Sequence, residues 1–313
     1  MFRLPRQNPG LFLSGCLPTA MRAWLGAAAW AAAVLGNVAA QGGDLPGVIR
    51  VPGEAPLNAE VEFVYRLPAA GKTPEPARPR VLLLVPGMNG VGRGMLTRDW
   101  CRFADDARLV LFAPSFRTTE AEIRTDRGYY YPDQWSGRVT EQALAELERR
   151  EAADVARIFL FGISAGAHFT HRFVLWNPKR VQAFVAYSAA WWDNPARKIP
   201  ERAAGLLPPG LIMCGEADPR HAESLQFFLR GRALDAPWLW RSYRDTGHRM
   251  IPAVQRMAEV FLRHYALNLP AAPLAGDIQT YQILPAAAAE QIPEAVRVAL
   301  PSAAVAAAWA KEE

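Results

Sequence analysis

The chain has 313 residues, of which 51% are hydrophobic and 21% are charged, so it can bury a large core and is not a disordered chain. Its formal charge is +5, but residues 1–40 contain three arginines and no acidic residue. Without them, the 35 basic residues fall to 32, against 30 acidic ones. This balance offers no basic stripe of the kind that binds nucleic acid, and we expect no nucleic-acid partner.

The N-terminal segment resembles a targeting sequence. Residues 21–40 begin with Met21 and Arg22, continue with an alanine-rich apolar run and end in small residues. This order is typical of a secretory signal peptide, with cleavage after Ala40 and with Met21 as an alternative start. The competing interpretation is a membrane anchor, although the apolar run is shorter than the roughly 20 residues of a spanning helix. We therefore expect a secreted or periplasmic protein of bacterial type, without a stable membrane span after cleavage.

Strand and helix patterns alternate along the rest of the chain. An alternating run at 59–65 predicts an edge strand. The run at 81–85 is apolar throughout, which is typical of a strand buried on both faces in a parallel sheet. Further strands are predicted at 109–114, 157–161, 182–187, 210–214 and 238–243, and helices at 96–105, 139–153, 167–176 and 253–267.

This alternation predicts an α/β fold with a doubly wound, mostly parallel sheet and helices on both faces. We expect one domain over residues 41–270, onto which an alanine- and proline-rich extension, 271–313, packs. About 20 residues separate the strand ending at 187 from the next one, too few for a large cap domain. Residues 115–137 form a long connection of the kind that often has a function.

A serine lies at one predicted strand-to-helix turn. Residues 162–166 have the pattern Gly-x-Ser-x-Gly, with Ser164 at its centre. Flanking glycines allow a sharp turn there, because they lack side chains that would collide with the strand and the helix. A serine becomes a nucleophile when an imidazole takes its proton. Without a well-placed histidine, Ser164 would be a simple helix cap.

His248 and Asp218 follow the ends of later strands. His248 is the one histidine of five that lies on a loop after the last predicted strand. Asp218 directly follows the strand that ends at residue 214, and would orient the imidazole. Glu216 and Asp245 are competing acids. Parallel strands end at the same edge of a sheet, so Ser164, Asp218 and His248 are candidates for one catalytic site.

An acyl-transfer site also needs two donors for the developing oxyanion. The backbone N–H of Ala165 is one candidate. The second is expected from the turn after the 81–85 strand, where Met88 is the first choice and Asn89 the alternative. The glycines near this turn do not form a dinucleotide-binding Gly-x-Gly-x-x-Gly pattern.

The sequence resembles the α/β-hydrolase superfamily, and within it the secreted esterases of the polyhydroxybutyrate depolymerase and feruloyl esterase type. Four segments carry this resemblance: 86–88, 162–167, 215–218 and 247–248. The resemblance covers about residues 80–267 and includes the chain order serine, aspartate, histidine. It implies a serine carboxylic-ester hydrolase that works through an acyl-enzyme. Pro86 departs from the histidine that many relatives have before the glycine. A serine peptidase and a non-catalytic binding protein with this fold are the alternatives.

An aromatic rim would suit apolar or aromatic ester substrates, whether small or polymeric. Trp191 and Trp192, on the loop after residue 187, are candidate substrate contacts. Tyr130, Trp135 and Asn89 are the other candidates. Ordinary core packing is the alternative role of all these aromatic residues. No metal-ligand spacing occurs, and we expect neither a metal nor a cofactor. Two cysteines, Cys101 and Cys214, remain after cleavage. Their sequence context permits either two free thiols or a disulfide.

Overall fold

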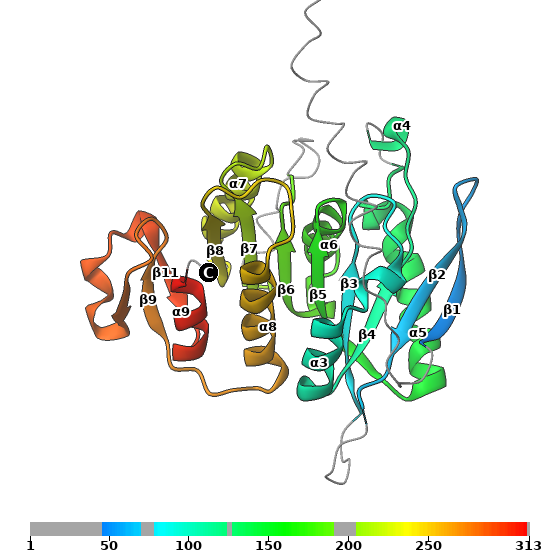
Figure 1. Ribbon diagram of the computed structural model, residues 1–313, viewed down its shortest axis with the longest axis horizontal. Helices are drawn as coiled ribbons and strands as arrows, with labels where there is room; N and C mark the ends of the chain where they lie inside the picture. Colours follow the sequence, from blue (N-terminus) through cyan, green and yellow to red (C-terminus); the bar gives the residue numbers. More distant parts are fainter. Residues whose placement is uncertain (1–45, 70–77, 124–126, 191–204, 312–313) are drawn as a thin grey trace, which may run out of the picture. The chain divides into compact units, whose positions relative to one another are not determined.

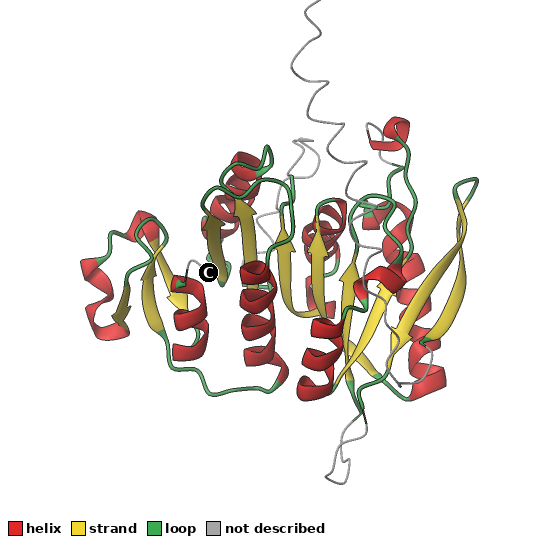
Figure 2. Cartoon of the chain, viewed as in Figure 1, coloured by secondary structure: helices red, strands yellow, loops and turns green. Residues whose placement is uncertain are grey.

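The computed structural model describes residues 46–69, 78–123, 127–190 and 205–311. Strands and helices alternate along most of this length, as Figure 2 shows. The strands are β1 (Gly47–Glu54), β2 (Asn58–Arg66), β3 (Arg80–Val85), β4 (Leu109–Pro114), β5 (Asp154–Ile163), β6 (Val181–Tyr187), β7 (Gly210–Gly215), β8 (Trp238–Tyr243), β9 (Leu274–Asp277), β10 (Ile283–Pro285) and β11 (Arg297–Leu300). The α-helices are α3 (Arg98–Ala107), α4 (Glu120–Ile123), α5 (Gly137–Glu151), α6 (Ala165–Trp176), α7 (His221–Arg232), α8 (Pro252–Ala266) and α9 (Ala303–Ala310), and shorter helical turns are η3 (Gly92–Met95), η4 (Pro132–Ser136), η5 (Pro178–Arg180), η8 (Ala286–Gln291) and η9 (Glu294–Val296).

The first eight strands form one sheet in the order β1-β2-β4-β3-β5-β6-β7-β8. The six strands from β4 to β8 in this order pair in parallel, whereas β2 is antiparallel to both of its neighbours. Helices α3, α8 and α9 cover one face, and α5, α6 and α7 cover the other (Figure 1). The predicted fold class, a doubly wound and mostly parallel sheet with helices on both faces, is confirmed.

The apolar strand predicted at 81–85 forms the buried centre of this sheet. All five of its side chains are fully buried, as expected where helices cover both faces. Its register aligns Leu83 with Phe112 of β4 on one side and with Leu160 of β5 on the other. These strands provide the rigid base from which the loops of the site project.

The prediction of an edge strand at 59–65 is wrong in one respect. Strand β2 forms there, but β1 pairs along its outer side, with Val51 opposite Val61, so β1 is the edge. Pro52 lies within β1, where a residue without an N–H is tolerated because an edge strand has one unpaired side. The proline-rich composition of this region conceals the strand.

The C-terminal extension contains the small sheet β10-β9-β11 and helix α9. Helix α9 packs against α8, and β11 lies against β8, the last strand of the large sheet. Trp309 of α9 is completely buried, and its indole N–H donates to the Trp240 carbonyl at 2.7 Å. The described part of the extension, up to residue 311, therefore packs on the main domain.

None of the helices within the described ranges has both the length and the apolar character that crossing a bilayer requires. The two cysteines of the described chain are free thiols rather than a disulfide. Cys214 is buried in β7, and this burial raises its pKa to about 12. Its thiol is therefore protonated and packs as a small apolar side chain.

Candidate active site

Ser164 occupies a strained turn between β5 and α6. Its φ of 55° and ψ of −121° lie in a region that a non-glycine residue occupies at a cost of about 1–3 kcal/mol. Hydrogen bonds on both sides hold this conformation: the Ser164 N–H donates to the Tyr187 carbonyl at 3.0 Å, and the Ser164 carbonyl accepts from the Ala167 N–H at 2.9 Å. The turn presents the hydroxyl at the carboxyl edge of the sheet.

The two motif glycines are required by close approach of the backbone. A Cβ on Gly166 would lie 2.1 Å from the Val85 carbonyl oxygen, and one on Gly162 would lie 2.3 Å from the Gly166 carbonyl oxygen. Both distances are impossible for real atoms, so α6 can pack against β3 and β5 only with glycine at these positions. This packing places the start of α6 beside the turn that follows β3.

The structure brings Ser164, His248 and Asp218 together. The Oγ of Ser164 lies 2.8 Å from Nε2 of His248, and Nδ1 of the same ring lies 2.8 Å from Oδ2 of Asp218. The imidazole is 35% exposed, whereas the Asp218 side chain has no exposed surface. With Nδ1 donating to Asp218, Nε2 is free to accept the serine proton.

The surroundings of Asp218 keep its carboxyl ionised. Burial alone would raise its pKa, but the hydrogen bond and charge of His248 and the backbone N–H of Arg220 lower that pKa below the usual aspartate value. The competing acids lie elsewhere. Glu216 accepts a hydrogen bond from the Ser242 hydroxyl at 2.9 Å, and Asp245 is an exposed residue of the β8–α8 loop.

The other four histidines occupy packed positions on helices. His168 accepts a hydrogen bond from the Ala190 N–H at 2.8 Å through Nε2. Burial lowers the pKa of both His168 and His171 far below the usual histidine value, so both are neutral. His221 stacks on Trp240, and His264 lies edge-on to Tyr265.

The turn after β3 lies against the serine. A Cβ placed on Gly87 would be 3.6 Å from the Ser164 Cβ, so the next residue, Met88, is at the site. The Gly90 N–H closes the turn on the Gly87 carbonyl at 2.9 Å. Ala165 is the first residue of α6, where backbone N–H groups have no partner within the helix. The oxyanion roles expected of Met88 and Ala165 stay predictions.

Asn89 holds a neighbouring loop. Its side-chain amide donates to the Thr118 carbonyl at 3.1 Å and its side-chain oxygen accepts from the Thr118 N–H at 2.7 Å. Its φ of 56° is left-handed, which asparagine tolerates better than most residues. In this arrangement the amide is used by the protein itself, and the predicted substrate contact of Asn89 stays a prediction.

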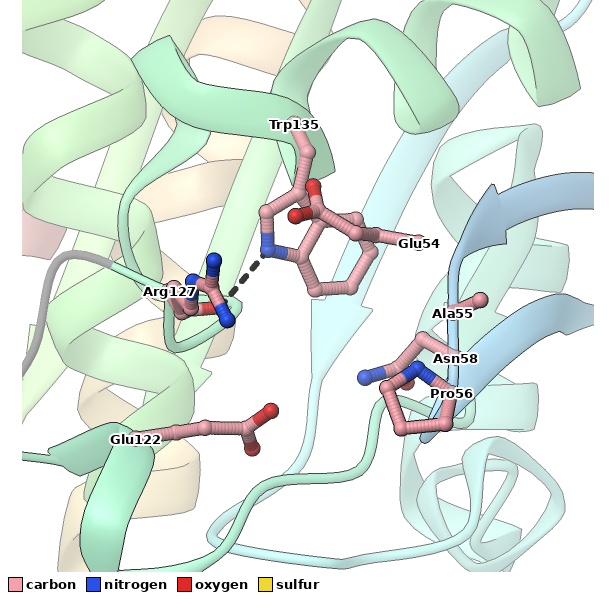
Figure 3. A pocket seen from close by; sticks show the side chains of 7 residues that line it. All are labelled: Glu54, Ala55, Pro56, Asn58, Glu122, Arg127 and Trp135. Atoms are coloured by element: carbon pink, nitrogen blue, oxygen red, sulfur yellow. Dashed lines mark hydrogen bonds between the residues drawn. The ribbon is translucent and has the colours of Figure 1, made fainter.

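The aromatic candidates of the long connection are buried. Tyr130 is 1% exposed and Trp135 is 3% exposed, and the Trp135 indole N–H donates to the Arg127 carbonyl at 2.8 Å. Their substrate contacts also remain predictions, and Trp191 and Trp192 lie outside the described residues. Trp135 contributes to a pocket whose lining does not include the serine, histidine or aspartate (Figure 3). The pocket is lined by Glu54, Ala55, Pro56, Asn58, Glu122, Arg127 and Trp135.

Across the described ranges, no three His, Cys, Asp or Glu side chains cluster in a way that could hold a metal ion. What the site does contain is a hydroxyl, an imidazole and a carboxylate in a hydrogen-bonded chain. Such a chain can transfer a proton away from the serine as it attacks an electrophilic carbon.

No protein-family model and no curated protein matches the sequence. Solved structures do match. An S-formylglutathione hydrolase from Agrobacterium tumefaciens has a TM-score of 0.55 at 20% identity, over 74% of this chain and 99% of that one. An esterase from Pyrobaculum calidifontis has a TM-score of 0.54 at 13% identity, over 83% and 95%. The poly(3-hydroxybutyrate) depolymerase LpqC from Bordetella parapertussis has a TM-score of 0.50 at 22% identity, over 71% and 90%.

These likenesses concern the fold, over 71–83% of this chain. The chain has the α/β-hydrolase fold, and the resemblance drawn from its motifs is confirmed at that level. Identities of 22% or less carry no activity over from those proteins to this one.

Proposed function

We propose that this protein is a serine hydrolase of carboxylic esters, with Ser164 as nucleophile, His248 as general base and Asp218 as the acid that orients it. The observation that carries the proposal is the pair of 2.8 Å contacts made by the two nitrogens of one imidazole. The strained backbone of Ser164 gives further support, because such strain is kept where a function requires it.

Acylation would begin when the Ser164 Oγ attacks the ester carbonyl carbon while Nε2 of His248 takes the hydroxyl proton. Asp218 would stabilise the resulting imidazolium through the bond to Nδ1. The N–H groups of Ala165 and Met88 would donate to the carbonyl oxygen as it becomes an oxyanion. Collapse of this tetrahedral intermediate breaks the bond to the alcohol, which leaves with the proton from Nε2, and an acyl-serine remains.

Deacylation would repeat these steps with water as the nucleophile. Nε2 of His248 takes a proton from the water as its oxygen attacks the acyl carbon, and the same oxyanion donors act again. Collapse then breaks the bond to Ser164, which regains its proton from the imidazolium. The products of this step are a carboxylic acid and the free enzyme, so the overall reaction consumes one ester and one water.

The ester class of the substrate is supported by the solved structures that share the fold. They include a ferulic acid esterase, an esterase and a poly(3-hydroxybutyrate) depolymerase. Export is supported by the order of charge, apolar run and small residues at 21–40. We therefore include secretion or periplasmic location, with removal of residues 1–40, in the proposal.

A fluorophosphonate probe tests the proposal, because it labels only a serine that a neighbouring base activates. We expect labelling of the wild type, and its loss in both Ser164→Ala and His248→Ala. Hydrolysis of short-chain p-nitrophenyl esters should be lost in the same two variants. The wild type should cleave these esters and leave aminoacyl amides uncleaved. In a producing bacterium, the labelled protein should lie in the periplasm or medium and begin directly after Ala40.

Three other outcomes would contradict parts of the proposal. An unlabelled wild type would favour the non-catalytic binding protein. Cleavage of aminoacyl amides at a rate comparable with esters would favour the serine peptidase instead. Labelled protein that stays in the cytoplasm with an intact N-terminus would overturn export alone.

A further inference from the structure

The histidine and the serine come from distant strands of the sheet. His248 follows β8, which is three positions from β5, the strand that precedes Ser164. Three strand spacings amount to about 14 Å. The loop after β8 must therefore return across the ends of β7 and β6 before the imidazole can reach the serine hydroxyl. Such a loop needs anchors, because a displacement of 1 Å can cost about a hundredfold in rate.

One anchor comes from the turn after β7. The Thr246 carbonyl accepts from the Ala217 N–H at 3.1 Å, and Gly215 is so close that a Cβ there would lie 2.0 Å from the same carbonyl oxygen. This contact fixes the loop two residues before His248. It also ties the histidine loop to the segment that carries Asp218.

The other anchor comes from the side chain of Tyr187, the last residue of β6. Its hydroxyl donates to the Arg249 carbonyl at 2.5 Å, directly after the histidine. His248 thus lies between an anchor at Thr246 and an anchor at Arg249. The second anchor depends on a single hydroxyl group, so a substitution can remove it without changing the backbone.

The same residue holds the nucleophile. The Tyr187 carbonyl accepts the N–H of Ser164 at 3.0 Å, in register with the pairing of Ile163 and Tyr187 between β5 and β6. Tyr187 is fully buried, and burial raises the pKa of its phenol well above the usual tyrosine value. The hydroxyl therefore keeps its proton and donates throughout the physiological pH range.

We propose that Tyr187 is a positioning residue that sets the distance between nucleophile and base. Its backbone carbonyl accepts a hydrogen bond from Ser164, and its hydroxyl donates one to Arg249, the residue after His248. This inference rests on the proposed function, since it concerns the rate of the step in which Nε2 takes the serine proton. The role assigned to Tyr187 involves no direct contact with the substrate and no proton transfer. The residue acts through the histidine loop.

Tyr187→Phe removes the hydroxyl and keeps the ring, and Tyr243→Phe is the matched control. Tyr243 is 3% exposed at the end of β8, and its hydroxyl meets the Met213 sulfur at 3.5 Å rather than the histidine loop. We expect kcat for a p-nitrophenyl ester to fall on the order of tenfold in Tyr187→Phe with KM unchanged, because the misplacement is a fraction of 1 Å. Fluorophosphonate labelling should slow by a similar factor, whereas Tyr243→Phe should match the wild type in both.

Hydrogen exchange gives a readout that does not depend on activity. Residues 244–250 should exchange faster in Tyr187→Phe than in the wild type, and Tyr243→Phe should leave their exchange unchanged. If Tyr187→Phe does not fold, as judged by its melting temperature, Tyr187→Met also lacks the donor and takes its place.

The inference is overturned if Tyr187→Phe labels and turns over at the wild-type rate, or if Tyr243→Phe is slowed equally. These results are distinct from failure of the proposed function, in which the wild type itself is not labelled and Ser164→Ala changes nothing. A fall in kcat confined to Tyr187→Phe, with faster exchange in its histidine loop, supports the inference.

Discussion

Asp218 is the member of the site whose ionisation is set most clearly by its surroundings. Its side chain has no exposed surface, which taken alone favours the neutral acid. The hydrogen bonds from His248 and from the Arg220 N–H outweigh that burial and lower its pKa. The carboxylate therefore stays charged at neutral pH, as its orienting role requires.

Asp218→Asn should lower kcat for ester hydrolysis by roughly 10³- to 10⁴-fold, because an amide favours the wrong tautomer of His248. The substrate does not contact the buried carboxylate, so KM should change little. Steady-state kinetics at pH 7 to 8 measure both constants. A loss of less than tenfold would assign the orienting role to another acid.

The same substitution has a consequence for stability. Because the folded-state pKa of Asp218 is lowered, the charged form stabilises the fold above the ordinary aspartate pKa of about 3.9, and this contribution is lost as the pH falls toward the lower folded value. The free energy of unfolding of the wild type relative to Asp218→Asn should therefore decrease in acid. Urea denaturation at several pH values measures it, and a difference that grows in acid would contradict the lowered pKa.

At the level of elements, the site depends on how closely α6 packs against β3. Gly166 brings the first turn of the helix into contact with the Val85 and Pro86 carbonyls, so that Ser164 and the Met88 turn lie beside each other. Gly166 is needed here because it lets two backbone segments come into direct contact. Neither backbone can move away without separating the serine from Met88, the proposed oxyanion donor on the turn after β3.

Gly166→Ala should lower the free energy of unfolding by about 3 kcal/mol or more, since the new Cβ would lie 2.1 Å from a backbone oxygen. Gly247→Ala is the control. A Cβ at Gly247 has no neighbour within 4 Å, and we expect a change within about 0.5 kcal/mol. Urea denaturation of both variants measures the two free energies of unfolding. Equal values would show that α6 can shift.

At the level of the whole molecule, the C-terminal extension adds a second buried layer beside β8. Trp309 is fully buried, meets the ring of Tyr281 at 4.9 Å and donates to the Trp240 carbonyl in β8. Arg241 of the same strand donates to the Lys311 carbonyl at 3.0 Å. These contacts join the extension to the last strand of the large sheet, just before the histidine loop.

Trp309→Ala should destabilise the protein by about 3–5 kcal/mol, as for other large aromatic truncations in a core. Because the extension packs on β8, we expect one cooperative unfolding transition at a lower temperature rather than two. Calorimetry measures this, with Leu269→Ala, at a residue that is 40% exposed, as the control. An unchanged main transition accompanied by a separate early one would show that the extension folds independently.

Much of the fold follows from local pattern. Continuous apolar runs predict the central strands because burial on both faces leaves no place for polar alternation, and the structure confirms them at β3 to β7. The edge was misjudged, because prolines near β1 conceal a strand whose pairing is visible only against β2. Tyr187 gives almost no signal in the sequence. An aromatic residue at the end of a buried strand is ordinary, and its contact with Arg249 spans 62 residues of chain.

The sequence by itself determined which residues lie at the carboxyl ends of the strands, since periodicity and turn chemistry are local properties. Ser164, Asp218 and His248 were found in this way. Only the tertiary structure decided that one imidazole meets both partners at 2.8 Å, that Glu216 is engaged by Ser242, and that Asn89 holds Thr118. Those contacts depend on strand order and on loops that cross neighbouring strands, and they form only when distant segments pack together.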